Sequence, residues 1–477
     1  MFIGRQEELQ FLEHHYAAAG GQLVVLYGRR RIGKTELLRK FCEGKEHIFY
    51  SCTEIPDAQQ LASFSERLLS AGLPAARYIR QFSDWESALR SLPELPFSGK
   101  KLIVIDEFPY MVKSAPSLPS LLQKLWDESL RHQNILLILC GSSMSFMEKE
   151  ILSEKNPLYG RASGILKMNE MDFYDAAQFF PRYTPIEKIT AYAVLGGTPH
   201  YLRQFDDTLS IGENIIRSIL TRGSILYSEV EFLLRQELRE TAVYNAIIEA
   251  VALGNTRLND LYAKTQIEKN KLSVYLKNMI ALGILQREFP VTAGVKERAA
   301  SQRGLYQVVD PFFRFWYAFV FPYLSELEAG DSLGIWQHAI EPELDSFVSR
   351  PFEEICRQFL RRLNKQDALP FHFTRIGRWW NKTDELDIMA SDAHSHQFLL
   401  GECKYKNSAF SLSDWEKTQH KFSQRNAALY YFLFSRSGFT ESLAAEAARQ
   451  NISLKTADDI VNGACSQAPA PSISVSL

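Results

Sequence analysis

The sequence lacks the cysteine pattern of a zinc ribbon or of a disulfide framework. Its six cysteines are scattered along the chain, and no two of them form a CxxC pair. We therefore expect reduced thiols and a cytoplasmic location. The cysteines are Cys42, Cys52, Cys140, Cys356, Cys403 and Cys465.

Long apolar runs and an excess of charge of one sign are also missing. The first nine residues contain no apolar signal core, and the most apolar stretch, residues 312–324, is short and includes Arg314. We therefore expect neither secretion nor a membrane partner. Lys and Arg total 54 against 56 Asp and Glu, so any surface for nucleic acid must be local.

The sequence has no internal repeat, and its composition is that of an ordinary globular protein. Apolar residues make up 46% of the 477 positions and charged residues 23%. At roughly 100–200 residues per domain, this length predicts about three domains. The last residues, 461–477, are rich in Pro, Ser and Ala, which predicts a disordered tail.

Short apolar runs alternate with helix-length segments in the first part of the chain. The runs cover residues 22–27, 47–52, 101–106, 135–140 and 164–168. Nearly all-apolar strands separated by helices are typical of a parallel sheet that is buried on both faces. The predicted fold class is therefore α/β, with a doubly wound parallel sheet.

A phosphate-binding motif, GRRRIGKT, follows the first apolar run and opens a helix-like segment. It fits GxxxxGK[ST], whose backbone N–H groups surround phosphate oxygens at the positive end of a helix. Lys34 would reach the β- and γ-phosphates, and the Thr35 hydroxyl would bind Mg²⁺. ATP and Mg²⁺ are therefore the predicted cofactors. The predicted ATP-binding residues are Gly28, Arg29, Arg30, Arg31, Ile32, Gly33, Lys34 and Thr35.

Two acids follow another apolar run, in KLIVIDEF. Asp106 ends the run, and its carboxylate can hold the hydrated magnesium opposite Thr35. Glu107 points to the other side of the strand end, where it can deprotonate the attacking water. We predict Asp106 and Thr35 as metal ligands and Glu107 as the catalytic base.

Polar residues after the next runs allow two interpretations each. Ser142 or Ser143, in ILLILCGSS, can sense the γ-phosphate or can be an ordinary turn serine. Arg161, in NPLYGR, can stabilise the transition state as an arginine finger, in cis or in trans, or can be a surface arginine. We include Arg161 among the candidate catalytic residues.

These motifs give the first half of the chain a resemblance to a known family. FIGRQEEL, YGRRRIGKT, VIDEF, LCGSS, PLYGR and GGTPHYL look like the archaeal-type P-loop ATPases of the STAND branch, which are relatives of the AAA+ proteins. The resemblance implies an ATP-hydrolysing core. It also implies that residues 2–5 lie near the adenine and that residues 196–199 belong to a helical lid.

A winged-helix domain is predicted in the middle of the chain. Residues 268–282 favour a helix in which Leu272, Leu276, Met279 and Ile280 share one face. Its other face carries lysines and asparagines, which can either contact a DNA major groove or simply be solvated. The strand-like ILQREF that follows Gly283 would begin the wing.

A hairpin is predicted near the C-terminal end, where the polar SDAHSH joins LDIMA to QFLLGECKY. Glu402 and Lys404 are two residues apart and therefore share a face of one strand. A turn around Ala393–His396 would pair Asp387 with Glu402 and bring Lys404 beside them. Because two facing carboxylates repel, Lys404 or Mg²⁺ must compensate their charge.

This constellation resembles the PD-(D/E)xK restriction-endonuclease-like superfamily. Asp387 matches the motif's Asp, and Glu402-Cys403-Lys404 matches ExK, although Leu386 stands where the fullest pattern has Pro. The resemblance implies that Asp387 and Glu402 hold a metal and that Lys404 acts on a metal-bound water. Glu353 or Glu354, in PFEEICRQFL, can be the further acid that many members of this superfamily carry, or can be an ordinary solvated helix acid.

The main functional prediction is a cytoplasmic, Mg²⁺-dependent ATPase coupled to a nuclease-like domain that acts on nucleic acid, with DNA favoured over RNA. The alternative is a STAND-type signalling switch with an inactive C-terminal domain, and a homo-oligomer is left open. The predicted parts are the P-loop core (1–167), the helical lid (168–230), the winged helix (231–325), the nuclease-like domain (341–460) and the tail (461–477).

Overall fold

The protein is described from a computed structural model that covers residues 2–154, 156–238, 240–300, 304–422 and 427–463. It divides into two compact units, one of Met1–Met171 with Thr198–His200 and one of Asp172–Gly197 with Tyr201–Leu477. Most of the predicted tail, with Cys465, lies outside the described residues. Val461 and Asn462 were predicted to belong to the tail, but they form the end of a helix.

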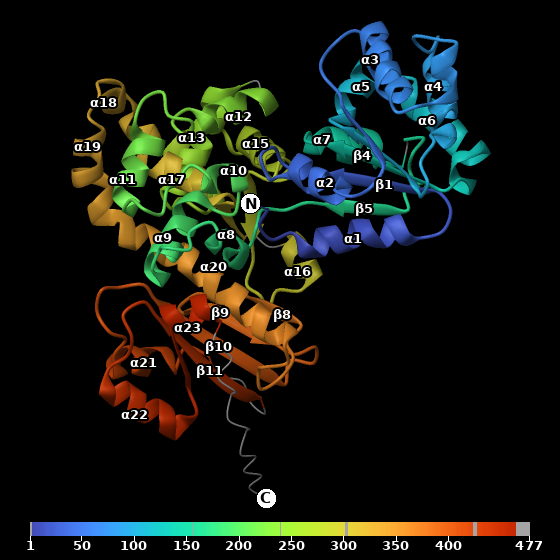
Figure 1. Cartoon of the computed structure of the whole chain (residues 1–477). Coiled ribbons are helices and arrows are strands. Elements are labelled where there is room, and N and C mark those ends of the chain that lie inside the picture. Colours follow the sequence, from blue (N-terminus) through green and yellow to red (C-terminus); the bar gives the residue numbers. More distant parts are fainter. Residues whose placement is uncertain (1, 155, 239, 301–303, 423–426, 464–477) are drawn as a thin grey trace, which may run out of the picture. The chain divides into compact units, whose positions relative to one another are not determined.

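The first unit is built on a sheet of five parallel strands in the order β2-β3-β4-β1-β5 (Figure 1). These strands match the five apolar runs and confirm the α/β prediction. The expected burial on both faces is wrong for β5, because only one of its faces is covered: Leu166 packs against the core, whereas Ile165, on the other face, is 52% exposed. The strands are β1 Gln22–Tyr27, β2 His47–Ser51, β3 Lys101–Asp106, β4 Ile135–Gly141 and β5 Gly164–Lys167.

Helices cover both faces of this sheet. Helices α1 and α2 bury Leu12 and Phe41 against one face, whereas α3 to α6 bury Phe64 and Trp126 against the other. Fully burying one such side chain contributes about 1.5–3 kcal/mol. The helices are α1 Gln6–Ala17, α2 Lys34–Cys42, α3 Asp57–Ser70, α4 Trp85–Arg90, α5 Phe108–Ser114, α6 Leu118–Glu128 and α7 Met144–Phe146.

Helices dominate the first part of the second unit. They share one apolar core, in which Phe312 and Trp316 are fully buried. In the part of the chain that the structure covers, no helix has both the length and the apolarity needed to cross a bilayer. The helices are α8 Phe173–Ala177, α9 Pro185–Leu195, α10 Pro199–Leu202 (shared with the first unit), α11 Ile211–Ile215, α12 Glu229–Glu237, α13 Thr241–Ala252, α14 Leu258–Thr265, α15 Lys269–Ala281, α16 Val295–Ala300, α17 Pro311–Phe319, α18 Leu324–Glu328 and α19 Ser332–Ile335.

Helix α15 is the helix expected at residues 268–282. Leu272, Leu276 and Met279 are buried as predicted, but Ile280 is 38% exposed. Ile280 follows Leu272 by eight residues, so at about 100° per residue it is rotated away from the buried stripe. The strand expected next is β6 (Leu285–Glu288), which pairs with β7 (Leu305–Val308) in an antiparallel ribbon.

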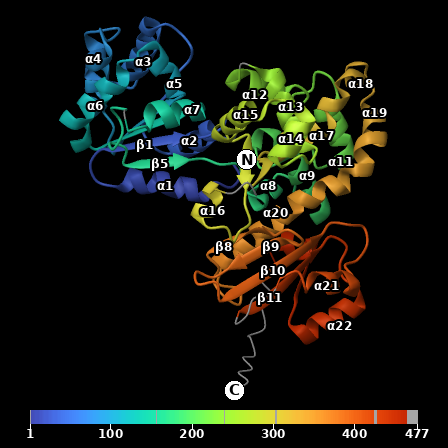
Figure 2. The ribbon, with the colours of Figure 1, turned by 180° about the vertical axis from the view of Figure 1, so that it is seen from behind.

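A second five-stranded sheet forms the C-terminal part of this unit, in the order β12-β11-β10-β9-β8. Helix α20 lies on one face, and α21 and α22 lie on the other (Figure 2). The strands are β8 Arg375–Trp380, β9 Glu385–Ser391, β10 Gln397–Lys404, β11 Ala428–Ser435 and β12 Ser453–Thr456. The helices are α20 Leu344–Lys365, α21 Leu412–Thr418, α22 Glu441–Gln450 and α23 Ala457–Asn462.

Strands β9 and β10 have the predicted register. Their antiparallel pairs run from Phe398 with Ser391 to Gly401 with Ile388, which is the register that a turn around Ala393–His396 predicts. Continuing this register places Asp387 beside the end of β10. The next strand, β11, runs parallel to β10 on its other side.

Candidate functional site

The predicted phosphate loop connects the end of β1 to the start of α2. A side chain at position 28 would bring its Cβ within 2.5 Å of the Met168 carbonyl oxygen, so Gly28 is required for this close approach. Gly33 has a φ of 91°, a conformation that residues with a side chain rarely adopt. The backbone conformation of the loop therefore requires glycine at both positions of the motif.

Lys34 is turned back onto its own loop. Its Nζ donates hydrogen bonds to the carbonyl oxygens of Gly28 at 2.9 Å and Arg29 at 2.7 Å. Burial lowers the pKa of Lys34 because the charged ammonium loses solvation. A phosphate that replaced these carbonyl groups would give the ammonium a full negative charge as its partner.

The two predicted magnesium ligands of the first unit are in contact. The Thr35 hydroxyl donates to Asp106 Oδ2 at 2.7 Å, and the Asp106 carboxylate is almost fully buried at the end of β3. A hydroxyl and a carboxylate are oxygen ligands of the kind Mg²⁺ prefers, and this ion keeps several waters. The pair therefore fits a magnesium site that ATP phosphates complete.

Glu107 follows Asp106 in a left-handed conformation, with a φ of 53°. Its Oε2 accepts hydrogen bonds from the Ser142 hydroxyl at 2.8 Å and from the Ser142 amide at 3.3 Å. The loop after β4 thus fixes the carboxylate beside the phosphate loop. Of the two serines considered from the sequence, Ser142 is the one that contacts the predicted base.

Side chains of the phosphate loop are bound to the rest of the unit. Arg29 forms an ion pair with Glu170 at 2.8 Å, and Arg30 donates to the Tyr110 hydroxyl at 3.3 Å. Arg31 has a φ of 69°, in the left-handed region that non-glycine residues seldom occupy. These contacts hold the loop in shape, and the predicted ATP contacts of the three arginines stay a prediction.

Two further contacts involve residues from the motifs. Arg5 donates to the Ile32 carbonyl oxygen at 3.0 Å, so the N-terminal segment reaches the phosphate loop. Arg161 forms an ion pair with Asp127 of α6 at 3.0 Å. A finger role for Arg161, which stays a prediction, requires this pair to open.

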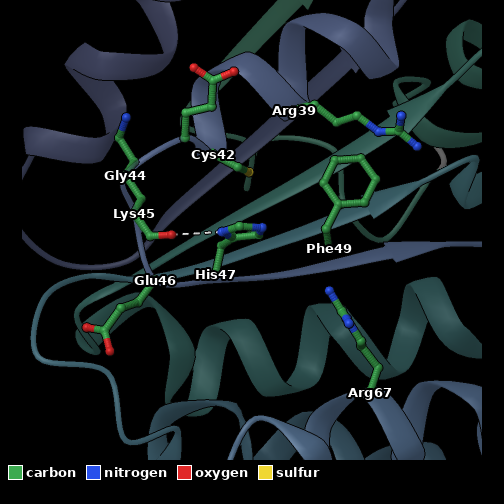
Figure 3. Close-up of a pocket in the computed structure, with 9 residues that line it drawn as sticks. Arg39, Cys42, Gly44, Lys45, Glu46, His47, Phe49 and Arg67 are labelled. Atoms are coloured by element: carbon green, nitrogen blue, oxygen red, sulfur yellow. Dashed lines mark hydrogen bonds between the residues drawn. The ribbon is translucent and has the colours of Figure 1, made fainter.

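A cavity of about 640 Å³ lies at the other end of α2 (Figure 3). Phe49 of β2 faces it, and Arg39 and Arg67 extend toward it from α2 and α3. It borders the amino-terminal end of β2, whereas ligands of open α/β sheets bind at the carboxyl ends of the strands. The cavity is therefore separate from the phosphate loop.

The C-terminal acids and the lysine predicted from the hairpin come together on β9 and β10. Asp387 Oδ2 accepts a hydrogen bond from the Cys403 amide at 2.8 Å, and Lys404 Nζ donates to Glu402 Oε1 at 2.7 Å. The Glu402 side chain is only 5% exposed. Burial opposes the charged form of Lys404, but Glu402 and Asp387 together raise the pKa of Lys404 above its ordinary value.

One further residue, which the sequence did not single out, binds the same carboxylate. Lys421 Nζ donates to Glu402 Oε2 at 2.9 Å, so each Glu402 oxygen has a lysine ammonium as its partner. Lys421 follows α21, 19 residues from Glu402 in the chain. No local pattern marks it, because only the packing of this segment brings it to β10.

Between the two candidates for a further acid, Glu353 is the one that acts on Asp387. Its side chain is 13% exposed and pairs with Arg378 at 3.4 Å, whereas Glu354 is 41% exposed and pairs with Arg357 at 2.7 Å. Burial raises the pKa of Asp387 to about 7, and the charges of Glu353 and then Glu402 add to the effect.

We predict that Asp387→Asn stabilises the protein at pH 8 by about 1–3 kcal/mol and by less than half as much at pH 5. Because the pKa of Asp387 is higher in the folded protein, the folded state holds a proton that the unfolded state has lost. That stabilisation is complete below pH 4 and is lost as the pH rises through about 7. Thermal unfolding in EDTA at both pH values measures the difference.

Asp367→Asn is the matched control, since the Asp367 side chain is 88% exposed. It is expected to leave the unfolding transition unchanged at both pH values. An Asp387→Asn variant that is less stable than the wild-type protein at pH 8 would contradict the assignment.

Two arginines that the sequence analysis missed hold the acids of this cluster in place. Arg357 donates to the Asp387 carbonyl oxygen at 3.0 Å and pairs with Glu354. Arg378 of β8 pairs with Glu353 and, at 3.4 Å, with Glu288 of β6. The two arginines and the acids that they pair with form one network, in which positive and negative charges largely compensate each other.

The donor set of the C-terminal cluster suits a cation with few protein ligands. Nowhere in the ranges given above do three or more His, Cys, Asp or Glu side chains gather in a way that could hold a metal ion. Mg²⁺, however, is commonly bound by one or two carboxylates and several waters. Asp387 and Glu402 supply two such carboxylates. For Glu402 to bind the cation, Lys421 must give up its hydrogen bond to Glu402 Oε2.

Two families match this chain. Residues 2–205 match the ATPase domain predominantly from Archaea. Residues 316–419 match a family of archaeal and bacterial proteins of unknown function, and this range includes Asp387, Glu402 and Lys404 but ends before Lys421. An uncharacterised protein of Methanocaldococcus jannaschii is 34% identical over 408 residues, which cover 85% of this chain and 88% of that protein.

Solved structures resemble the chain at lower identity. A Walker-type ATPase of Pyrococcus abyssi has 22% identity and a TM-score of 0.48, over 66% of this chain and 96% of that one. The ORC2 protein of Aeropyrum pernix, solved in ADPNP and ADP complexes, has 15% identity and a TM-score of 0.46, over 68% and 94%.

Proposed function

The chain belongs to the family of ATPases that occur predominantly in Archaea, and from that premise we propose a Mg²⁺-dependent ATPase whose nucleotide cycle controls a nuclease-like domain acting on nucleic acid. The observation that carries the second half of the proposal is the cluster that Asp387 and Lys404 form with the buried Glu402 on adjacent strands. The five free cysteines of the described chain are in keeping with a cytoplasmic location.

In the ATPase core, the positions of four predicted residues support their proposed roles. Lys34 exchanges the loop carbonyl groups for the β- and γ-phosphates. Thr35 and Asp106 would hold Mg²⁺, which neutralises charge on the phosphates when bound. Glu107, fixed by Ser142, orients the attacking water and accepts its proton.

In the C-terminal domain, Asp387 and Glu402 would hold the cation, which supplies an activated water when bound. Lys404 donates to Glu402 and lies near enough to Asp387 to be affected by its charge. Its ammonium can therefore stabilise the negative charge that develops on an attacked phosphodiester. Glu353 adds negative charge behind Asp387.

The middle of the second unit supports the winged-helix interpretation. Three consecutive helices, α13, α14 and α15, precede the β6–β7 ribbon, as such a domain requires. Lys269, Lys271 and Lys277 are exposed on α15. These lysines would bind phosphates of a DNA duplex that lies against α15.

Nuclease assays test the proposal. The purified protein is incubated with Mg²⁺ or Mn²⁺ and with duplex DNA, single-stranded DNA or RNA, beside a Glu402→Ala variant. Metal-dependent cleavage that the variant lacks supports the assignment, whereas cleavage that persists in the variant contradicts it. Lys34→Ala tests the coupling, which fails if this variant loses ATP binding and still cleaves with an unchanged rate and DNA affinity.

The alternative is an ATP-driven signalling switch in which the C-terminal domain binds a partner without cutting. Lys404 and Lys421 each bind one oxygen of Glu402, and this favours the alternative because no Glu402 oxygen is then left for a cation. ATP hydrolysis without cleavage of any substrate, at all metal concentrations, would support the switch.

A further inference from the structure

The Glu402 carboxylate has two positive partners of different origin. Lys404 lies on the same strand two residues away, as the ExK pattern requires, and leaves one carboxylate oxygen unused. Lys421 comes from the segment after α21 and takes that second oxygen at 2.9 Å. Only 5% of the Glu402 side chain is exposed, so water cannot take the place of Lys421 in stabilising the negative charge on this oxygen.

The segment that carries Lys421 is fixed to the sheet. The ring of the next residue, Phe422, packs against Phe398 of β10 at 5.2 Å and against Trp379 of β8 at 5.3 Å between centroids. The Lys421 amide also donates to the Thr418 carbonyl oxygen at the end of α21. The Lys421 backbone is therefore held beside the cluster, while its four-carbon side chain can change direction.

The charges around Glu402 decide what can bind there. Arg357 and Arg378 are paired with other acids, Glu353, Glu354 and Glu288, whereas Lys404 and Lys421 both hold Glu402. The Lys421 ammonium, which holds Glu402 Oε2, is therefore a direct competitor for the oxygen that a divalent cation needs.

We propose that Lys421 is an internal counter-ion that takes the place of a divalent cation at Glu402 and that the cation must displace it. The inference rests on the proposed metal site of the nuclease-like domain. Lys421 is a positioning residue in this account, because it keeps the buried carboxylate compensated until a metal arrives. Once displaced, its ammonium is free to contact a phosphate of the nucleic acid.

The test is Mn²⁺ binding to the full-length protein without nucleotide, measured by titration calorimetry. Lys421→Met, which removes the charge and keeps most of the side-chain volume, is expected to bind Mn²⁺ about tenfold tighter or more than the wild-type protein. Lys417→Met is the matched control, since Lys417 is exposed on α21 four residues earlier, and its affinity is expected to be unchanged. Lys421→Gln replaces Lys421→Met if that variant does not fold.

The outcomes separate this inference from the function it rests on. Equal Mn²⁺ affinity in Lys421→Met and the wild-type protein, with binding lost in Glu402→Ala, overturns the role of Lys421 and leaves the metal site standing. Mn²⁺ binding that is absent from both proteins, or unchanged in Glu402→Ala, overturns both. Tighter binding in Lys421→Met that Glu402→Ala abolishes supports both.

Discussion

Glu107→Gln is expected to slow ATP hydrolysis by about 100-fold or more while ATP still binds. Glutamine has the same shape as glutamate and can keep the hydrogen bonds from Ser142, but it cannot accept a proton from the attacking water. Glu107 lies outside the phosphate-binding motif, so nucleotide affinity is expected to stay close to that of the wild-type protein. Phosphate release measures the turnover, and a fluorescent ATP analogue measures the binding.

Glu66→Gln is the control for this experiment, because Glu66 is exposed on α3 and lies far in the chain from the catalytic motifs. Its turnover is expected to equal that of the wild-type protein. A Glu107→Gln variant that retains more than about a tenth of the activity would show that another group accepts the proton.

The largest effect on stability is expected from Arg357→Met, at about 3–5 kcal/mol of lost unfolding free energy. The side chain of Arg357 is 9% exposed, and its guanidinium compensates Glu354 at 2.7 Å and Glu353 at 3.8 Å. Methionine fills much of the volume but leaves Glu354 without its main cation and Glu353 without one of its cations, and the Asp387 carbonyl oxygen loses its donor. Urea unfolding followed by tryptophan fluorescence measures the change.

Arg361→Met provides the comparison on the same helix. Arg361 also pairs with Glu354, at 2.8 Å, but its side chain is 44% exposed, so water replaces the lost contact. We expect a loss of less than about 1 kcal/mol. Similar losses for Arg357→Met and Arg361→Met would contradict the view that burial gives Arg357 its importance.

The features that sequence predicted well depend on local or periodic signals. The five apolar runs became the five strands of the first sheet, and the position of the polar turn at residues 393–396 was enough to set the register of β9 and β10. The phosphate motif also specifies its own context of strand and helix. Such patterns lie within short stretches of sequence and can be recognised without knowledge of the tertiary fold.

The features that sequence missed depend on distant charges. Lys421 binds Glu402 across 19 positions, Arg357 binds the Asp387 carbonyl across 30, and Arg378 reaches Glu288 across 90. A lysine or an arginine on its own is usually a solvated surface residue, so none of these stood out. The exposure of Ile280 was misjudged for a related reason, since an apolar stripe predicts a buried face but not how far around the helix burial extends.

The contact between the β6–β7 ribbon and the C-terminal sheet has a consequence for dividing the protein into fragments. Arg378 pairs with Glu288 of β6, and the Val291 amide donates to the Arg378 carbonyl oxygen at 2.8 Å. The Val291 side chain also packs with Leu386 and Met389 in one apolar cluster. A fragment cut at residue 341 would lack Val291, and a hydrophobic patch on the sheet would face water. Proteolysis is therefore expected to release the ribbon and the C-terminal sheet as one piece.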